Sequence, residues 1–365
     1  MRIVQIVTQM EPAGAQKVAH TLHQAFRERG HDAELWFLYL KRAAYLGSPG
    51  VQVLWHHPPS KPDYVRIAAR LLGWLRSRKP DVVLSHTHYA NVMGQVAAAV
   101  AGIRSRVAVH HGIIRAYPGF ARCLDHILGA LGLYTSQIAV SRAVIESMAG
   151  YPKAYTQSVR CIYNGVPIEL CGGNDRKARD VRGPHQILHV GRFAKEKNHS
   201  VLLRALLHMP NASLTLVGDG ELRSQIEAEA RVLGLTNRVV FAGEIPHPQV
   251  QALMRSCDLF MFPSRCEAMP MAVLEAMAAA MPIVASDIPA HREFLQGAGL
   301  LVSPDPSGFA EAGTKLLTNP DLSLELGKRA AERARSFSTE FMVSQYEQLL
   351  LQTQWSCLQH QQQPA

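Results

Sequence analysis

The chain has 365 residues, of which 47% are hydrophobic and 18% are charged, and its formal net charge is +9. This length predicts two domains of ordinary size, each able to bury a core of its own. Every apolar stretch of about 18 residues contains a charge, so the sequence predicts no membrane-spanning helix.

Two features predict a cytoplasmic protein. The stretch MRIVQIVTQM is typical of a strand and a loop rather than a signal peptide, because Glu11, Gly14 and Lys17 follow at once. The six cysteines are scattered without C-x-x-C spacing, which favours reduced thiols.

The positive charge is confined to the first half of the chain. Residues 1–165 hold 19 Lys and Arg against 8 Asp and Glu, whereas the remainder carries a small negative excess. A basic half indicates an anionic partner or an anionic surface, and the alternative is charge that serves solubility alone. We expect no nucleic-acid partner.

The chain opens as a βαβ unit. A strand over residues 2–8 and a helix over 16–29, ended by Gly30, precede a second strand over 33–39. Gly14 lies in the connecting loop, where α/β folds bind ligands, although a lone glycine there is more often only a turn.

Residues 62–79 and 113–134 allow two interpretations. The first segment has apolar residues at helical spacing among several arginines. It is either a helix packed on the core or a basic amphipathic face that rests on an anionic membrane. The second, which contains Arg115, is predicted to be a mobile loop that leads into a helix.

Histidines follow two predicted strands, over 81–85 and 107–110. Residues just past the carboxyl end of a strand line the ligand crevice of an α/β fold. His86, His88, His110 and His111 could suggest a metal, but no Cys or carboxylate completes a ligand set, so we predict none.

The second half begins with another predicted strand, over 186–190. Arg192 and Lys197 follow it, five positions apart. Two cations so placed can straddle a diphosphate, although they can also be merely solvated. Further strands are predicted over 213–217, 239–243 and 258–262; the turn at Gly218 and the residue Glu244 follow the first two.

Two carboxylates, Glu267 and Glu275, stand eight positions apart in the stretch 262–293. Glu267 lies in a predicted turn, CEAMP, at residues 266–270. A helix is predicted over 271–280, and a strand over 282–286. Eight positions are about two helical turns, which suits carboxylates that grip different ends of one long polar ligand better than a metal pair.

The same stretch resembles a known family. Ser264-Arg265-Cys266-Glu267, Pro270 and Leu274-Glu275-Ala276-Met277 resemble the E-x7-E signature of retaining glycosyltransferases of family 4 with the GT-B fold. Segments similar to other elements of that family are RVAVHHG, IAVS, CIYNGV, GRFAKEKN, VGDG and VVFAG. The resemblance extends from about residue 2 to residue 352.

The resemblance implies an α/β protein, with two Rossmann-like domains of doubly wound parallel sheet that face a central cleft. We expect an acceptor-binding domain over 1–167, a linker over 168–184 and a nucleotide-sugar-binding domain over 185–336. A helix over 337–353 is expected to cross back to the first domain, before a disordered tail over 354–365.

The resemblance also implies roles for particular residues. His111 is expected beside the donor sugar, with His110 as the alternative match. Arg192 and Lys197 are expected to bind the diphosphate, and Glu267 the sugar hydroxyls. The remaining donor-side residues are Gly14, Gly218, Glu244, Ala268, Met269, Pro270 and Glu275, of which Glu275 is expected to bind the ribose. His86 and Arg115 are expected on the acceptor side.

Three positions depart from the family pattern. Ala268 and Ala290 stand where glycine is common, and Ala13-Gly14 replaces Gly-Gly. If residue 268 needs a positive φ, alanine costs about 1 kcal/mol there.

We therefore predict a retaining, metal-independent hexosyltransferase without a cofactor. It would move sugar from a nucleotide-diphosphate sugar such as a UDP-sugar to a hydroxyl of a glycan or lipid-linked acceptor. A place in polysaccharide or glycolipid synthesis, peripheral to the inner face of the membrane, is expected. The alternatives are a nucleotide-sugar epimerase, a glycosyltransferase acting on a small aminocyclitol, and a non-catalytic nucleotide-sugar-binding module.

Overall fold

The computed structural model describes residues 1–117, 119–167, 169 and 183–359. The chain forms two compact units. Unit 1 comprises Met1–Gly165 with the C-terminal segment from Glu340, and unit 2 comprises Val166–Thr339. The predicted linker, 168–184, lies almost wholly outside the described residues.

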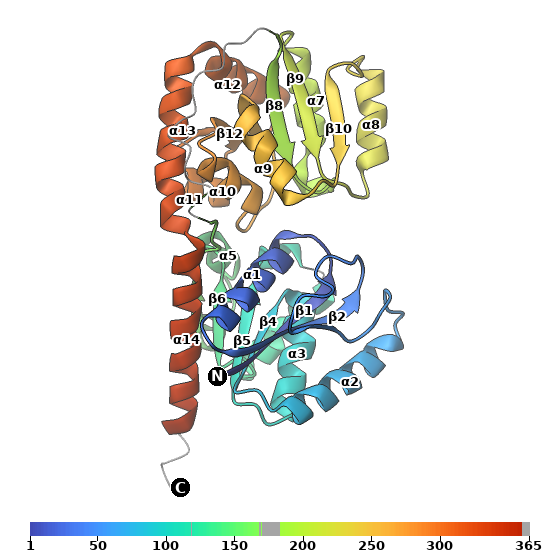
Figure 1. Ribbon diagram of the computed structural model, residues 1–365, viewed down its shortest axis with the longest axis vertical. Helices are drawn as coiled ribbons and strands as arrows, with labels where there is room; N and C mark the ends of the chain where they lie inside the picture. The colour runs from blue at the N-terminus through green and yellow to red at the C-terminus, as the bar shows by residue number, and fades with distance from the viewer. Residues whose placement is uncertain (118, 168, 170–182, 360–365) are drawn as a thin grey trace. The chain divides into compact units, whose positions relative to one another are not determined.

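Unit 1 is built on a seven-stranded parallel sheet in the order β3-β2-β1-β4-β5-β6-β7 (Figure 1). Its strands are β1 Arg2–Met10, β2 Asp32–Leu40, β3 Val51–Val53, β4 Val82–His86, β5 Ser105–His110, β6 Ser136–Ala139 and β7 Val159–Cys161. Its helices are α1 Gly14–Glu28, α2 Asp63–Arg78, α3 His88–Val100, α4 Gly119–Ala130, α5 Arg142–Ser147, α6 Lys153–Thr156, α14 Thr339–Gln359 and the 3-10 helix η1 Ile114–Ala116.

Strand alternation explains how this sheet is covered on both faces. Val4 and Ile6 of β1 pack with residues of α2 and α3 in one core cluster, whereas Val7 packs with Ala19 of α1 in another. Successive side chains of a strand point to opposite faces, so β1 contributes side chains to the cores on both faces of the sheet. The chain reverses direction across the sheet between β1 and β4, the switch point where such folds bind ligands.

Unit 2 repeats this plan with six parallel strands in the order β10-β9-β8-β11-β12-β13. Its strands are β8 His185–Val190, β9 Ala212–Val217, β10 Val239–Gly243, β11 Leu259–Phe262, β12 Ile283–Ser286 and β13 Leu300–Val302. Its helices are α7 His199–Leu207, α8 Arg223–Val232, α9 His247–Ser256, α10 Met271–Ala278, α11 Pro289–Leu295, α12 Pro306–Thr318, α13 Pro320–Ala334, and the 3-10 helices η4 Lys195–Lys197 and η5 Arg335–Phe337. The switch point here lies between β8 and β11.

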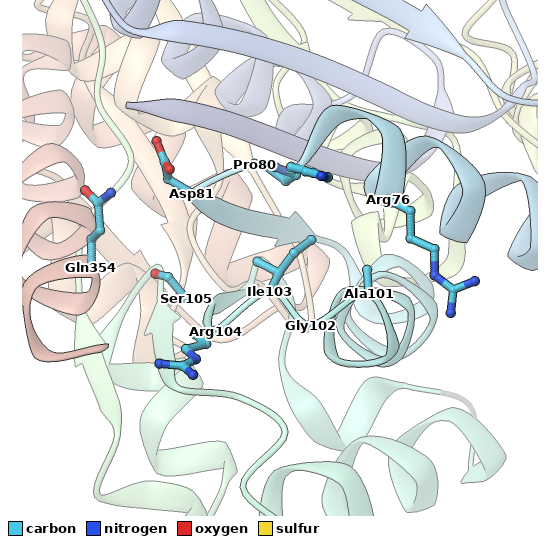
Figure 2. Close-up of a pocket in the computed structure, with 10 residues that line it drawn as sticks. Arg76, Pro80, Asp81, Ala101, Gly102, Ile103, Arg104, Ser105 and Gln354 are labelled. Carbon is cyan, nitrogen blue, oxygen red and sulfur yellow. The ribbon is translucent and has the colours of Figure 1, made fainter. Parts of the chain in front are cut away.

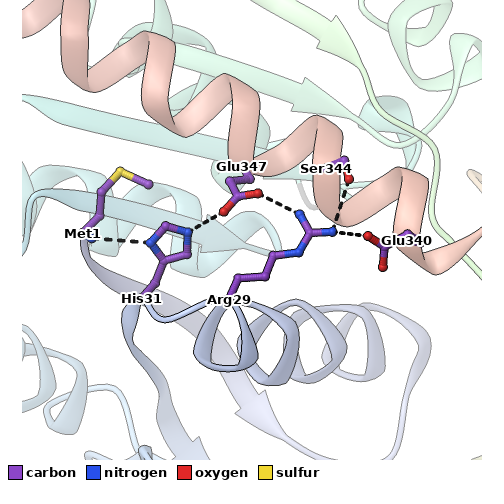
Figure 3. Close-up of polar contacts among 6 residues, drawn as sticks. All are labelled: Met1, Arg29, His31, Glu340, Ser344 and Glu347. Carbon is purple, nitrogen blue, oxygen red and sulfur yellow. Dashed lines mark hydrogen bonds and ion pairs between the residues drawn. The ribbon is translucent and has the colours of Figure 1, made fainter.

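Helix α14 is tied to unit 1 by ion pairs at its N-terminal half (Figure 3). Glu347 accepts hydrogen bonds from Arg29 at 2.7 Å and from His31 at 2.6 Å. Arg29 also pairs with Glu340 and donates to Ser344. The helix continues to Gln359, so the prediction of a disordered tail from residue 354 is wrong as far as 359. Residues 360–365 lie outside the described residues.

None of the helices in the described ranges combines the length and the hydropathy that crossing a bilayer requires. The apolar stripe of α2, formed by Ile67, Leu71 and Leu75, is buried in the core of unit 1.

Candidate active site

Backbone hydrogen bonds join the loops at the carboxyl edge of the unit 2 sheet. Gly191 N donates to Val217 O at 2.9 Å, and Gly218 N donates to Gly243 O at 2.8 Å. Arg265 N donates to the carbonyl of Glu196, also at 2.8 Å. The loops after β8, β9, β10 and β11 are therefore held together, as parallel strands ending at one edge require.

Gly218 is required by the neighbouring backbone. Its φ is +130°, and a Cβ placed on it would lie 2.2 Å from Gly191 O. A substituted side chain would overlap this carbonyl, and the backbone conformation itself disfavours any residue but glycine. Gly218 is one of the predicted donor-side residues, and in the structure the loop after β8 lies directly against it.

Lys197 and Glu267 form a largely buried ion pair between two of these loops. Lys197 Nζ lies 2.5 Å from Glu267 Oε1, and the side chains are 17% and 10% exposed. The ammonium also lies 4.9 Å from the centroid of the Phe262 ring. A cation over an aromatic face and beside a carboxylate is attracted by both. The two residues that were predicted to meet phosphate and sugar therefore meet each other.

Arg192 has a different environment from Lys197. Its side chain is 62% exposed and pairs with Glu196 at 2.9 Å. Both cations come from the loop after β8, but each contacts its own carboxylate. An exposed pair of this kind contributes at most about 1 kcal/mol to folding, so Arg192 is available to an anion at little cost.

Glu275 projects from α10 and is buried to 7% exposure. Its Oε1 lies 3.1 Å from His247 Nε2, at the start of α9. His247 was not among the predicted site residues. The sequence feature that could have identified His247 is its position three residues after Glu244, just beyond the end of β10.

The turn before α10 corrects one expectation. Ala268 and Met269 are buried, and Pro270 caps α10 with φ −75°. Ala268 is not among the residues with positive φ, so alanine carries no left-handed backbone cost here. Ala290 is likewise accommodated, buried within α11. Glu244, the remaining predicted donor-side residue of unit 2, is exposed after β10.

Buried imidazoles lie behind the Lys197 pair and were also missed from the sequence. His189 Nδ1 donates a hydrogen bond to Met261 O at 2.9 Å, and burial lowers the pKa of His189 well below the usual value. Burial, then the charge of Lys197, lowers the pKa of His199 to about 4. The rings of Phe193 and His199 are stacked, with centroids 4.3 Å apart. These neutral rings add no positive charge at neutral pH.

In unit 1, two of the predicted histidines are in direct contact. His86 Nδ1 lies 2.9 Å from His111 Nε2, and His86 Nε2 lies 2.9 Å from Gln5 Oε1. Burial, then the charge of His110, lowers the pKa of His111 to about 3. His110 is engaged elsewhere, since its Nε2 lies 3.0 Å from Gln137 Oε1. Of the two neighbouring histidines, His111 is therefore the one joined to His86.

The backbone beside His86 is strained. Thr87 has φ +74° and ψ 149°, a region that costs a residue with a Cβ about 1–3 kcal/mol. Its Oγ1 lies 2.6 Å from Thr8 Oγ1, and Thr8 Oγ1 also accepts from Ala90 N. Strain held in place by surrounding hydrogen bonds is typical of functional sites.

The other predicted residues of unit 1 lie in different loops. Gly14 begins α1 without a side-chain cap, and Arg115 is exposed in η1. Neither hydrogen-bonds to the His86–His111 pair in the described part of the chain. Within residues 1–117, 119–167, 169 and 183–359, no three His, Cys, Asp or Glu side chains gather as metal ligands would.

A cavity of about 540 Å³ lies at the opposite edge of the unit 1 sheet (Figure 2). Its lining includes Arg76, Lys79, Asp81, Arg104 and Gln354. Asp81 and Arg104 directly precede β4 and β5, so the cavity lies at the amino ends of these strands. No predicted site residue lines it.

Two family models match the chain. The family described as Glycosyl transferases group 1 matches residues 174–335, and the one described as Glycosyltransferase Family 4 matches residues 12–170. EpsF of Bacillus subtilis, a glycosyltransferase by name, is 30% identical over 223 residues, which are 57% of this chain and 57% of EpsF. The chain thus spans little more than half the length of this relative.

Two further similarities extend over more of the chain. The uncharacterized glycosyltransferase MJ1607 of Methanocaldococcus jannaschii is 26% identical over 326 residues, covering 82% of this chain and 83% of that protein. The solved structure of Anabaena HepE in complex with UDP and glucose is 21% identical and has a TM-score of 0.82, covering 96% of this chain and 100% of HepE. The two family models and this shared architecture place the chain in the family-4, group 1 glycosyltransferases with the GT-B fold.

Proposed function

We propose that this protein transfers a sugar from a nucleotide-diphosphate sugar to a hydroxyl acceptor, with retention at the anomeric carbon and without a metal. The observation that supports this most directly is the Lys197–Glu267 pair at the carboxyl edge of unit 2. It supplies a cation for a leaving diphosphate and a carboxylate for sugar hydroxyls, side by side. UDP is the first donor nucleotide to test, because the similar HepE structure contains UDP and glucose.

The proposed reaction breaks the bond between the anomeric carbon and the diphosphate oxygen, whose electron pair leaves with the nucleotide. The acceptor oxygen bonds to the anomeric carbon on the same face, and its proton passes to the departing phosphate. Lys197 and Arg192 stabilise the negative charge that grows on that phosphate in an oxocarbenium-like transition state. Glu275 accepts hydrogen bonds from the ribose, in exchange for its contact with His247.

Nucleotide binding is tested by thermal shift with UDP, GDP and ADP, each with EDTA and with added Mg²⁺. We expect one nucleotide to raise the melting temperature in both conditions. A shift that requires Mg²⁺ would overturn the metal-independent proposal. Glu275→Gln should lose much of the shift, whereas the control Glu311→Gln, at an exposed position of α12, should keep it.

Transfer is distinguished from epimerisation by omitting the acceptor. Incubation of the protein with its nucleotide sugar alone should leave the sugar unchanged apart from slow hydrolysis. Conversion to an epimer in the absence of acceptor would replace the transferase proposal with the epimerase alternative. NMR of the anomeric proton of the product would then establish retention or inversion.

We further propose a glycan or lipid-linked acceptor presented at an anionic membrane surface. Unit 1 carries the positive excess of the chain, and α2 exposes Val65 together with Arg66 and Arg70. Phe120 and Leu131, at the two ends of the α4 region, are 76% and 71% exposed. Flotation with vesicles that contain phosphatidylglycerol tests this, and failure to bind at low salt would remove the membrane from the proposal.

A further inference from the structure

Three polar side chains form a line across the unit 1 sheet, from its interior to its carboxyl edge. Gln5 of β1 contacts His86 of β4, which contacts His111 just past β5, at 2.9 Å in each step. Gln5 and His86 are fully buried. His111 is partly exposed.

The strand register explains this line. Gln5 pairs with Leu84, and His86 pairs with Val109. Residues two apart on a strand share a face, so each contact joins a residue to the diagonal neighbour two positions further along the next strand. The line can therefore reach the edge where ligands bind only because β1, β4 and β5 are adjacent.

The hydrogen-bond partners determine where the protons lie. In the orientation that the structure gives the Gln5 amide, Oε1 faces His86 Nε2 and can only accept, so His86 carries its hydrogen on Nε2. A neutral imidazole has a single N–H, which leaves a lone pair on His86 Nδ1. This lone pair faces His111 Nε2, which must then be the N–H of that ring. His111 Nδ1 is left with a lone pair and has no hydrogen-bond partner among the described residues.

We infer that Gln5 and His86 are positioning residues that hold His111 in its Nε2–H tautomer, so that the Nδ1 lone pair accepts a hydrogen bond from a hydroxyl of the donor sugar. The role of that lone pair rests on the proposed function, whereas the tautomer does not. Fixing the tautomer of one imidazole through the hydrogen bond at its other nitrogen is a general device of histidine sites.

Two further observations support the positioning role of Gln5 and His86. Gln5 Nε2 is buried without a hydrogen-bond partner, and such an orphan costs about 1–3 kcal/mol. An apolar residue would avoid that cost, so the benefit must come from the bond that Oε1 accepts. Beside His86, the strained turn at Thr87 is fixed by Thr8 of β1, which holds β4 and β1 in the register the line needs.

The tautomers are read by long-range ¹H–¹⁵N correlation spectra of protein labelled at histidine, with His86→Gln and His111→Gln for assignment. We expect both His86 and His111 to be neutral with the hydrogen on Nε2 at pH 7.5. A wild-type spectrum with the hydrogen of His111 on Nδ1 would overturn the inference, whatever the variants do.

Two substitutions test the role of Gln5. Gln5→Glu keeps an acceptor and should keep the Nε2–H signal of His111, whereas Gln5→Leu should let the Nδ1–H tautomer appear. Gln137→Leu is the matched control, because it removes an equally buried glutamine from His110 without touching this line. An unchanged His111 tautomer in Gln5→Leu would also refute the positioning role.

Kinetics separate this inference from the proposed function. If transfer is observed, Gln5→Leu should lower kcat/KM by about 10- to 100-fold, the range known for losing a hydrogen bond that orients a metal-binding histidine, and Gln5→Glu should retain most of it. Absence of transfer with every donor tested would refute the proposed function. The tautomer assignment would not be affected, because the spectra test it independently. An unaltered kcat/KM in Gln5→Leu would refute the use of the lone pair.

Discussion

Lys197 Nζ lies 2.5 Å from Glu267 Oε1 and joins the loop after β8 to the loop after β11. The residues are 70 positions apart, and both are largely shielded from water. A charge held in such a place is stabilised by its partner, so that removing one partner exposes the other to the full cost of burial. This relationship gives the first prediction.

Lys197→Ala should lower transfer by at least about 100-fold, the loss typical of removing one charge-stabilising donor from a transition state. The unit should still fold, although Glu267 will be left unpaired and stability will fall. Steady-state kinetics and circular dichroism measure the two effects. Arg204→Ala breaks an exposed ion pair of the same unit and should change neither the turnover nor the stability by much. Near-normal turnover in Lys197→Ala would contradict the phosphate role.

Arg192→Ala should separate binding from stability. Because Arg192 is 62% exposed and its pair with Glu196 is at the surface, its loss should change the free energy of unfolding by less than about 1 kcal/mol. Donor affinity should nevertheless weaken, as measured by titration calorimetry with the nucleotide diphosphate. Lys195→Ala, which removes a cation from the same loop, serves as the control. Equal losses of affinity in both variants would indicate a general charge effect.

Gly218→Ala should be far more destabilising than Gly234→Ala. Both glycines have positive φ, but a Cβ at Gly218 would lie 2.2 Å from Gly191 O, whereas nothing lies within 4 Å of one at Gly234. The second change should cost only the backbone strain, about 1 kcal/mol. Urea unfolding measures the change in the free energy of unfolding for both variants. Similar costs for the two variants would show that the loops at the carboxyl edge can move apart.

Histidines that the fold keeps neutral should make stability fall as the solution is acidified. The pKa of His111 is lowered to about 3 and that of His199 to about 4, below the unfolded value of about 6.5. Between these values the unfolded chain binds protons that the native chain does not, so stability is full above pH 6.5 and declines below it.

His111→Gln tests this dependence. In urea unfolding between pH 6.5 and 5, the wild-type free energy of unfolding should fall, by at most about 1.4 kcal/mol per pH unit for each such group. The variant should show a shallower decline. A slope equal to that of the wild type would mean that His111 is not held neutral by the fold.

Glu347→Ala should loosen the attachment of α14 to unit 1. Glu347 accepts hydrogen bonds from both Arg29 and His31 (Figure 3), so its loss removes two partly buried contacts at once. Faster hydrogen exchange over 340–355 is the expected result. Gln348→Ala, at an exposed position on the next residue, should leave exchange unchanged. An effect of the same size in both variants would mean that the apolar face of α14 alone holds it.

Local pattern was sufficient for most of the secondary structure. The alternation and apolar runs of RIVQIVT, DVVLS and DLFMF predicted strands that the structure confirms as β1, β4 and β11, with small differences at their ends. The helix predicted over 62–79 is α2, Asp63–Arg78. Periodicity is a property of neighbouring residues, so it can be recognised without knowledge of the fold. The end of α14 was misplaced because a polar sequence does not by itself end a helix that packs on a domain.

The E-x7-E stretch and its accompanying motifs identified the family, and the GT-B architecture followed from that resemblance. The partners of the motif residues could not be derived in the same way. That Lys197 meets Glu267, that Glu275 meets His247, and that Gln5 reaches His111 through His86 all depend on the order of strands in each sheet. The backbone angle at Ala268 also depends on how its turn packs. These contacts join residues distant in sequence, and only the tertiary structure decides which strand ends become neighbours.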